Sequence, residues 1–297
     1  MKYFMIFVFA MLCLFGCGEA GIEITLHDLG APPLAQGAVT AVPIEIQAQL
    51  WDDSEAYPAY YTRYIDAGGV AIVGSARVSD EIFMMAHDVV LEMTAKHPEI
   101  REKLSPEHGH YQILVNGRYE DVTDIPENVF SRPNPHCGVN RIMGNRMGTY
   151  CVSFYHDHPY PPGRSRENRN SGILNTFVHE FAHAIHHAIK GQPQWAVDWF
   201  GWDPALATLD PTFDDRLLTA YETALENRTW AGLYAETEYN EYWAEGVQWW
   251  YYHVTDSPFA KPSGPLFRTR EAFAERDPLL VALLREWFYE GEFFGRY

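Results

Sequence analysis

Two histidines and a glutamate in one short segment are the residues of this chain best suited to metal binding and acid-base chemistry. His179-Glu180-Phe181-Ala182-His183 places two imidazoles four positions apart. On a helix these rings lie one turn apart on the same face, so both can point at one cation. Glu180 is rotated about 100° from His179, which lets its carboxylate reach a water beside the metal without being a ligand. The spacing predicts a zinc site in which Glu180 is the general base.

A catalytic zinc ion needs three protein ligands and an open position, so a third ligand is expected elsewhere in the chain. Some zinc enzymes have a histidine six residues after the motif, but Ile189 stands there. Others have a glutamate nineteen residues after it, where this chain has Trp202. Asp198 and Asp203 are acidic residues near the motif, although the aromatic segment around them lacks the usual pattern of a ligand.

Glu241 is the strongest candidate for the third ligand, because it lies in a segment with helical spacing of apolar residues, 239–252. Glu241 and Glu245 share one face of this helix, so Glu241 can bind zinc while Glu245 supports a ligating histidine. The helix is expected to be largely buried because of the residues that flank the acids, Tyr242, Trp243, Val247, Trp249 and Trp250. Buried carboxylates seldom lack partners. The predicted ligands of one Zn²⁺ ion are therefore His179, His183 and Glu241.

The two segments resemble the gluzincin metallopeptidases, and within them the catalytic domain of anthrax lethal factor and the secreted clostridial proline-specific endopeptidases. The resemblance rests on residues 179–183 and on Glu-Tyr-Trp-Ala-Glu at 241–245, and it covers residues 175–248. It implies a zincin-like fold and peptidase activity. In these relatives a tyrosine seven residues before the ligand glutamate stabilises the tetrahedral intermediate, which assigns that role to Tyr234. The resemblance does not indicate a substrate.

We do not expect the remaining histidines to bind a second metal ion. His186 and His187 continue the motif helix and are expected to face solvent or make polar contacts. His156 and His158 stand at the start of a segment expected to be a loop. The Trp-rich segment 195–202 is interpreted as packing rather than as a carbohydrate-binding platform.

Strand patterns come first along the chain. Short apolar runs predict strands at 70–73, 113–115 and 150–155. A helix is predicted from Ser79, which is suited to an N-cap. Alternation around Ile44 indicates an arm or edge strand within residues 21–60, and the Pro- and Gly-rich segment 156–170 predicts an exposed loop.

Helical patterns dominate the second half of the chain. They cover residues 171–190, 213–226 and 239–252, and a last helix is capped by Asp277 with Pro278 in its first turn. Because strands come first and helices later, residues 61–297 are predicted to form an α+β fold. An N-terminal mixed sheet with helices would precede the active-site helix and a mainly helical C-terminal half, with the chemistry in a cleft between the two lobes.

Composition and charge narrow the functional classes. The chain has 297 residues, is 47% hydrophobic and carries a net charge of -18. This length and hydrophobic content are typical of a folded globular protein, and the negative charge opposes binding to nucleic acid or anionic lipid. Residues 1–20 are interpreted as a signal peptide, because the apolar run at their start is too short for a comfortable membrane span. Either ordinary cleavage or a lipobox at Cys17 fits, so the protein is expected outside the cytoplasm, secreted or lipid-anchored.

An exported chain allows a disulfide and a peptide substrate. Cys137 and Cys151 are the two cysteines outside the leader, and an oxidising compartment favours joining them; two buried free thiols are the alternative.

The predicted function is that of a zinc metalloendopeptidase acting on peptides or proteins. Two alternatives stay open: a binding or adhesion module that keeps the zinc fold without activity, and a zinc hydrolase of a non-peptide amide.

Overall fold

The computed structural model describes the parts of the chain that surround the predicted site. These are residues 37–50, 59–105, 112–116, 141–143, 146–153, 169–191, 208–251, 267 and 269–290. Several predictions concern residues outside this range and stay predictions. They involve the leader 1–20 with Cys17, the disulfide partner Cys137, His156, His158, the segment 195–202, Asp198 and Asp203.

Six strands form one mixed sheet in the order β1-β2-β3-β4-β6-β5. Their bounds are β1 Thr40–Ala41, β2 Tyr61–Ala67, β3 Val70–Ser75, β4 Gln112–Asn116, β5 Arg141–Met143 and β6 Arg146–Ser153. The inner strands β3, β4 and β6 are parallel, whereas β1, β2 and β5 run antiparallel to their neighbours. Gly68 and Gly69 join β2 to β3 with φ angles of 65° and 100°, a conformation that glycine adopts without steric cost.

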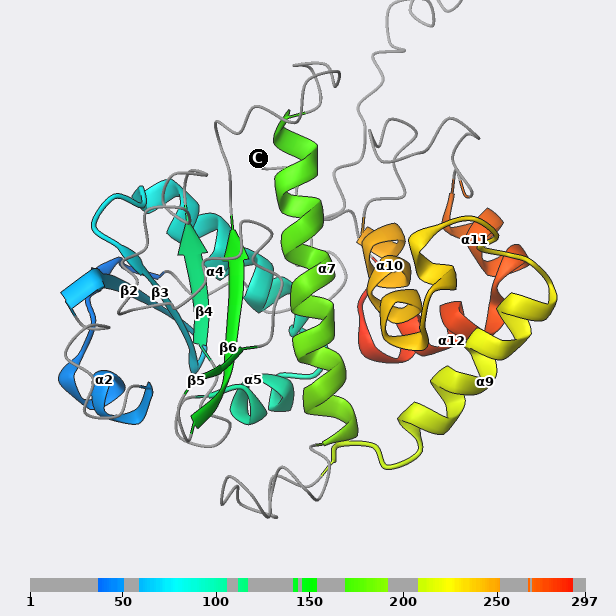
Figure 1. Ribbon diagram of the computed structural model, residues 1–297, viewed down its shortest axis with the longest axis horizontal. Coiled ribbons are helices and arrows are strands. Elements are labelled where there is room, and N and C mark those ends of the chain that lie inside the picture. The colour runs from blue at the N-terminus through cyan, green and yellow to red at the C-terminus, as the bar shows by residue number, and fades with distance from the viewer. Residues whose placement is uncertain are drawn as a thin grey trace, which may run out of the picture.

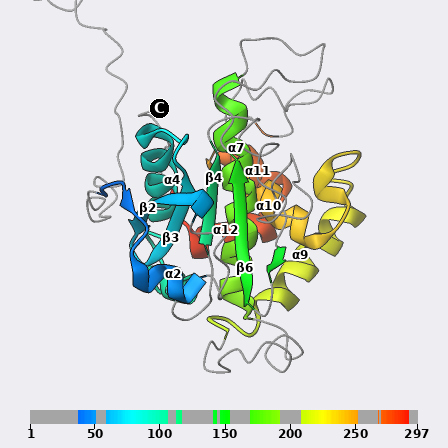
Figure 2. The same ribbon diagram turned by 60° about the vertical axis from the view of Figure 1, so that its left-hand side comes forward.

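Helices cover the sheet on the side of the predicted site. Every residue of β3 is buried, and α4 (Asp80–Met93) packs against β2, β3 and β4. Ser79 caps α4 by accepting a hydrogen bond from the backbone N–H of Ile82. The short helix α5 (Glu99–Lys103) follows and contacts α7 (Arg169–Lys190), which itself packs on β6 (Figure 2).

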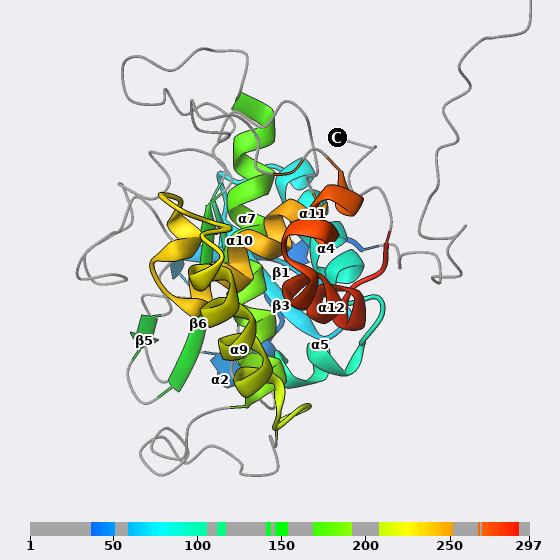
Figure 3. The ribbon, with the colours of Figure 1, turned by 90° about the vertical axis from the view of Figure 1, so that its right-hand side faces the viewer.

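The second half of the described chain is helical. Its elements are α9 Phe213–Glu226, the 3-10 turn η2 Tyr234–Glu236, α10 Tyr239–Tyr251, α11 Arg270–Arg276 and α12 Pro278–Trp287. Figure 1 shows α7 standing between the sheet and these helices, and Figure 3 views the molecule from the side of α9, α10 and α12. In the described part of the chain, no helix has the length and apolar character to cross a membrane.

The helix α7 is the centre of this arrangement. From Phe177 onward its side chains are buried except for Glu180, His183, His187 and Lys190, which are partly exposed. These four recur every three or four residues and therefore form one stripe along the helix. The histidine-glutamate motif thus lies where the core meets a more open face of α7.

The structure confirms an α+β fold with strands before helices, and most of the predicted elements. The predicted strands correspond to β3, β4 and β6, and the predicted helices to α4, α7, α9, α10 and α12. Asp277 caps α12 by accepting from the backbone N–H of Leu280, with Pro278 at the first turn. Some boundaries differ: β3 and β4 extend past the predicted runs by one or two residues, β6 begins at Arg146, ahead of the predicted strand, and α7 begins at Arg169, inside the predicted loop.

The segment 21–60, predicted to be an arm or edge strand, does contain the edge strand β1, but the residues around Ile44 on which the prediction was based form a helix. Ile44 to Leu50 form the helix α2, and the edge strand β1 lies just before it, at Thr40–Ala41. The carbonyl of Pro43 accepts a hydrogen bond from the N–H of Gln47, which starts the helix. Ile44 itself is 76% exposed. A three-residue alternation is therefore too short to establish a strand beside a proline that can begin a helix.

Candidate metal centre

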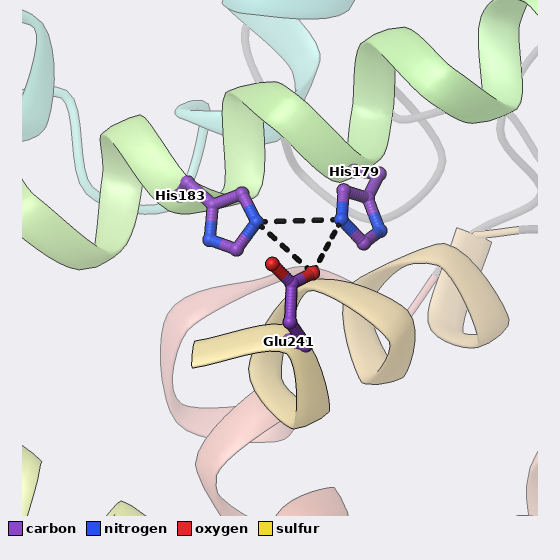
Figure 4. Close-up of side chains that lie close together, drawn as sticks. All are labelled: His179, His183 and Glu241. Carbon is purple, nitrogen blue, oxygen red and sulfur yellow. Dashed lines mark hydrogen bonds and ion pairs between the residues drawn. The ribbon is translucent and has the colours of Figure 1, made fainter. Parts of the chain in front are cut away.

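Two helices bring three potential metal ligands together. His179 and His183 project from α7 toward Glu241 of α10 (Figure 4). The Nε2 atom of His179 is 2.9 Å from Oε2 of Glu241 and 3.3 Å from Nε2 of His183. The Nε2 atom of His183 is 3.5 Å from the same carboxylate oxygen. Among the described residues, these three form a group whose ligand atoms could hold a metal ion.

The meeting of the helices depends on the residues beside these ligands. Trp243 is fully buried, and its indole N–H donates to the carbonyl of Ala182 over 3.0 Å. This bond joins α10 to α7 within the turn of α7 that carries the histidines. Glu241 lies two positions before Trp243, so the indole fixes the part of α10 from which the carboxylate projects.

His179 is held on both edges of its ring. Its side chain is buried, with Glu241 at Nε2 and two α10 residues at Nδ1. Nδ1 is 3.0 Å from Oε1 of Gln248 and 3.5 Å from Oε1 of Glu245. Burial alone would lower the pKa of His179, but the hydrogen bond to Glu241 and the nearby carboxylate of Glu245 raise it to about 10. The ring therefore lies in an environment that favours positive charge at this position.

The pKa values of the two acidic residues of the centre are shifted in opposite directions. Burial raises the pKa of Glu180 to about 7, an effect that His179 opposes and Glu241 reinforces. Burial acts in the same direction on Glu241, but the hydrogen bond from His179 and the nearby ring of His183 outweigh it and lower the pKa of that carboxyl group far below its usual range. Glu241 is thus anionic, as a metal ligand must be, whereas Glu180 is suited to exchanging a proton near neutral pH.

Tyr234 lies beside the ligands on the more exposed side. It begins η2, and its ring lies against that of His179 with 6.2 Å between centroids. Burial and the neighbouring carboxylates of Glu241 and Glu180 raise the pKa of Tyr234 to about 12. The side chain is 53% exposed, so it is a protonated hydroxyl donor that faces solvent next to the three ligands.

His186 does not face solvent, although this was one of its two predicted environments. It is fully buried and its Nε2 atom lies 2.6 Å from Oδ1 of Asp214 in α9. Its ring also packs against Phe213, Tyr239 and Trp243. The predicted polar contact is therefore present, in the core rather than at a second metal site.

The structure brings together the five residues singled out in the sequence, His179, Glu180, His183, Tyr234 and Glu241. Glu245 lies near Nδ1 of His179, as predicted for a supporting residue. Gln248 is closer and was not predicted. Its position three residues after Glu245 places it on the same face of α10, a spacing from which the contact could have been foreseen.

A comparison of the chain with protein-family models, curated proteins and solved structures finds no match. The geometry of the centre is therefore the main indication of what the chain does.

Proposed function

We propose that this chain is a zinc-dependent metallopeptidase of the gluzincin type, in which His179, His183 and Glu241 hold one Zn²⁺ ion. The observation that carries the proposal is the spacing of the three ligand atoms, 2.9, 3.3 and 3.5 Å. Ligand atoms about 2.1 Å from a tetrahedral zinc ion lie about 3.4 Å from one another. The spacing therefore fits three corners of a zinc coordination tetrahedron.

The chemistry of the donors supports zinc. Two imidazole nitrogens and one carboxylate oxygen are a ligand set that catalytic zinc accepts. The contact of Nδ1 of His179 with Gln248 directs the other ring nitrogen, Nε2, toward the ligand group. When bound in such a site, zinc acts as a Lewis acid and lowers the pKa of water to near 7.

The other two residues have separate roles in the proposed reaction. Glu180 takes a proton from the attacking water and passes it to the leaving amine. Tyr234 donates a hydrogen bond from its hydroxyl to the oxyanion that forms from the scissile carbonyl. The position of Tyr234 beside His179 and its exposure support a role at the open side of the centre.

The proposal extends to the substrate and the site of action. Peptides or proteins are the expected substrates, bound in a cleft between the two lobes of a zincin-like fold. The net charge of -18 favours neutral or cationic substrates and opposes nucleic acid. The leader at residues 1–20 directs the enzyme out of the cytoplasm, with Cys17 as a lipid anchor in one of the two processing routes.

A mixed peptide library tests the proposed reaction. Purified protein is incubated with the library with and without a chelator, and the products are identified by mass spectrometry. We expect cleavage that the chelator abolishes and that added Zn²⁺ restores. Retention of peptides without cleavage would favour the binding or adhesion module. A protein that binds zinc but neither cuts nor retains peptides would favour hydrolysis of a non-peptide amide.

A further inference from the structure

One face of α10 surrounds the ring of His179. Glu241, Glu245 and Gln248 are spaced by four and three residues, so their side chains project from the same side of the helix. Glu241 contacts Nε2 of His179, while Glu245 and Gln248 lie at Nδ1. A single helix therefore supplies both a metal ligand and the groups that orient another ligand.

The two acceptors at Nδ1 differ in distance and charge. Oε1 of Gln248 is 3.0 Å from Nδ1, within the usual range of an N–H···O hydrogen bond. Oε1 of Glu245 is 3.5 Å away, beyond that range. The amide oxygen can accept the Nδ1 proton without adding another negative charge to a centre that already contains Glu180, Glu241 and Glu245.

We propose that Gln248 is the positioning residue of His179, and that its amide oxygen accepts the Nδ1 proton and keeps Nε2 directed at the metal. This inference rests on the proposed zinc function. Histidine ligands of metals usually donate their second ring N–H to a partner, and loss of that partner weakens metal binding or activity by about 10–100-fold. Glu245 has a secondary role, because its oxygen lies farther from the ring.

Zinc release distinguishes the two acceptors. The wild-type protein, Gln248→Leu and Glu245→Gln are loaded with Zn²⁺, and release is followed with a chromophoric chelator. We expect Gln248→Leu to release zinc about 10–100-fold faster and Glu245→Gln to stay within a few-fold of wild type. Gln47→Leu is the matched control, since it removes the hydrogen bond that the side chain of Gln47, in α2, donates to the backbone carbonyl of Val42. Faster release from Glu245→Gln but not from Gln248→Leu overturns the inference.

Two further measurements distinguish loss of this hydrogen bond from misfolding of a variant and from failure of the proposed zinc function. Gln248→Glu keeps an acceptor of similar shape, and we expect it to retain zinc far better than Gln248→Leu; equal loss in both variants overturns the inference.

Long-range ¹H–¹⁵N spectra recorded without added metal report the Nδ1 proton of His179. We expect a resonance that persists in Glu245→Gln and is lost to exchange in Gln248→Leu, and an unchanged resonance in Gln248→Leu overturns the inference. A wild-type protein that binds no zinc would overturn the proposed function while this spectrum still tests the hydrogen bond.

Discussion

Residues of the same type have different roles in this centre because their surroundings differ. Glu241 accepts a hydrogen bond from His179, lies 3.5 Å from Nε2 of His183 and is held anionic, whereas burial raises the pKa of Glu180 to about 7. The histidines differ as well, because His179 is contacted at both ring nitrogens while His186 is bonded to Asp214 in the core. The short motif therefore determines where these side chains lie, and neighbours from other helices determine their protonation and contacts.

Replacing Glu180 by Gln is expected to separate metal binding from catalysis. Gln is similar in shape but cannot take up a proton, so peptide cleavage should fall about 10²–10⁴-fold while the zinc content stays near one ion per chain. Glu241→Gln is the matched comparison, because the same chemical change at a ligand should release zinc. Peptidase assays and elemental analysis of both variants measure this. Cleavage by Glu180→Gln at the wild-type rate would contradict the general-base role.

Replacing Tyr234 by Phe is expected to lower kcat while leaving zinc in place. The change removes only the hydroxyl that donates to the oxyanion, and loss of one such donor typically costs about 10²–10³-fold in kcat. KM should change little, because the donor acts mainly after the carbonyl has been attacked. Steady-state kinetics with a cleaved library peptide and a zinc assay measure both. An unchanged kcat would reject the role of Tyr234.

At the level of secondary structure, the candidate metal centre forms where the helices α7 and α10 cross. Neither helix has all three ligands, since His179 and His183 lie on α7 and Glu241 on α10. Trp243 holds the crossing through the Ala182 carbonyl and packs against Phe213 and Phe288. The register of the two helices is therefore fixed by a buried hydrogen bond and by aromatic packing, within one turn of the ligands.

Replacing Trp243 by Phe is expected to weaken both the fold and the metal site. The change leaves the Ala182 carbonyl without its donor, at a cost of about 1–3 kcal/mol in the free energy of unfolding, and frees α10 to shift against α7. Zinc release should therefore be faster. Trp249→Phe is the control on the same helix, because Trp249 packs against Phe267 instead. If both variants released zinc at the same rate, the bond from Trp243 to Ala182 would not position Glu241.

The whole molecule is organised around α7, which is buried between the sheet and the C-terminal helices (Figure 1). The two sides are also joined directly. Nε2 of His97 lies 2.9 Å from the backbone carbonyl oxygen of Glu286, at the end of α12, and the ring packs on Trp287. Deep in the core, His186 connects α7 to α9 and α10. The stability of the metal centre is therefore coupled to that of the entire fold.

His186 is expected to make the folded state sensitive to acid. Burial lowers its pKa to about 4, although Asp214 in α9 opposes the shift; Lys190 and His183 on α7 reinforce it. Its other ring neighbours are Phe213, Tyr239 and Trp243, which carry no charge in this range, and His187, whose pKa burial lowers to about 3. An unfolded histidine takes up a proton near pH 6.5, so between about pH 6.5 and 4 the unfolded state binds more protons. Stability is complete above this window and is lost as the pH falls through it, by about 1.4 kcal/mol per pH unit.

Urea unfolding of the wild-type protein and of His186→Gln between pH 4.5 and 7 measures this effect. Gln can still donate to Asp214 but does not titrate in this range. We expect the free energy of unfolding of the variant to depend less steeply on pH, by about 1.4 kcal/mol per pH unit. Parallel curves for the two proteins would show that His186 does not cause the acid sensitivity.

The sequence by itself determined the features that depend on neighbours along the chain. Helix spacing and capping predicted α9 at its observed bounds and α12 with its Asp277 cap. The histidine motif and the helical position of Glu241 identified the three residues that the structure brings together and that could hold a metal ion, because the chemistry of a metal site restricts which residue types can form it. Segments with strong local patterns are predictable since hydrogen bonds within a helix and its caps involve residues that are close in sequence.

The tertiary structure alone decided which distant residues meet. The strand order, the burial of His186 against Asp214 and the contact of Gln248 with His179 depend on how helices and strands pack. Ile44 shows the same limit, because its alternation with polar neighbours suits a strand while the chain forms a helix there. Packing adds contacts between residues far apart in sequence, and these override weak local preferences. Local pattern therefore identified the candidate ligands, whereas packing decided which residues contact them.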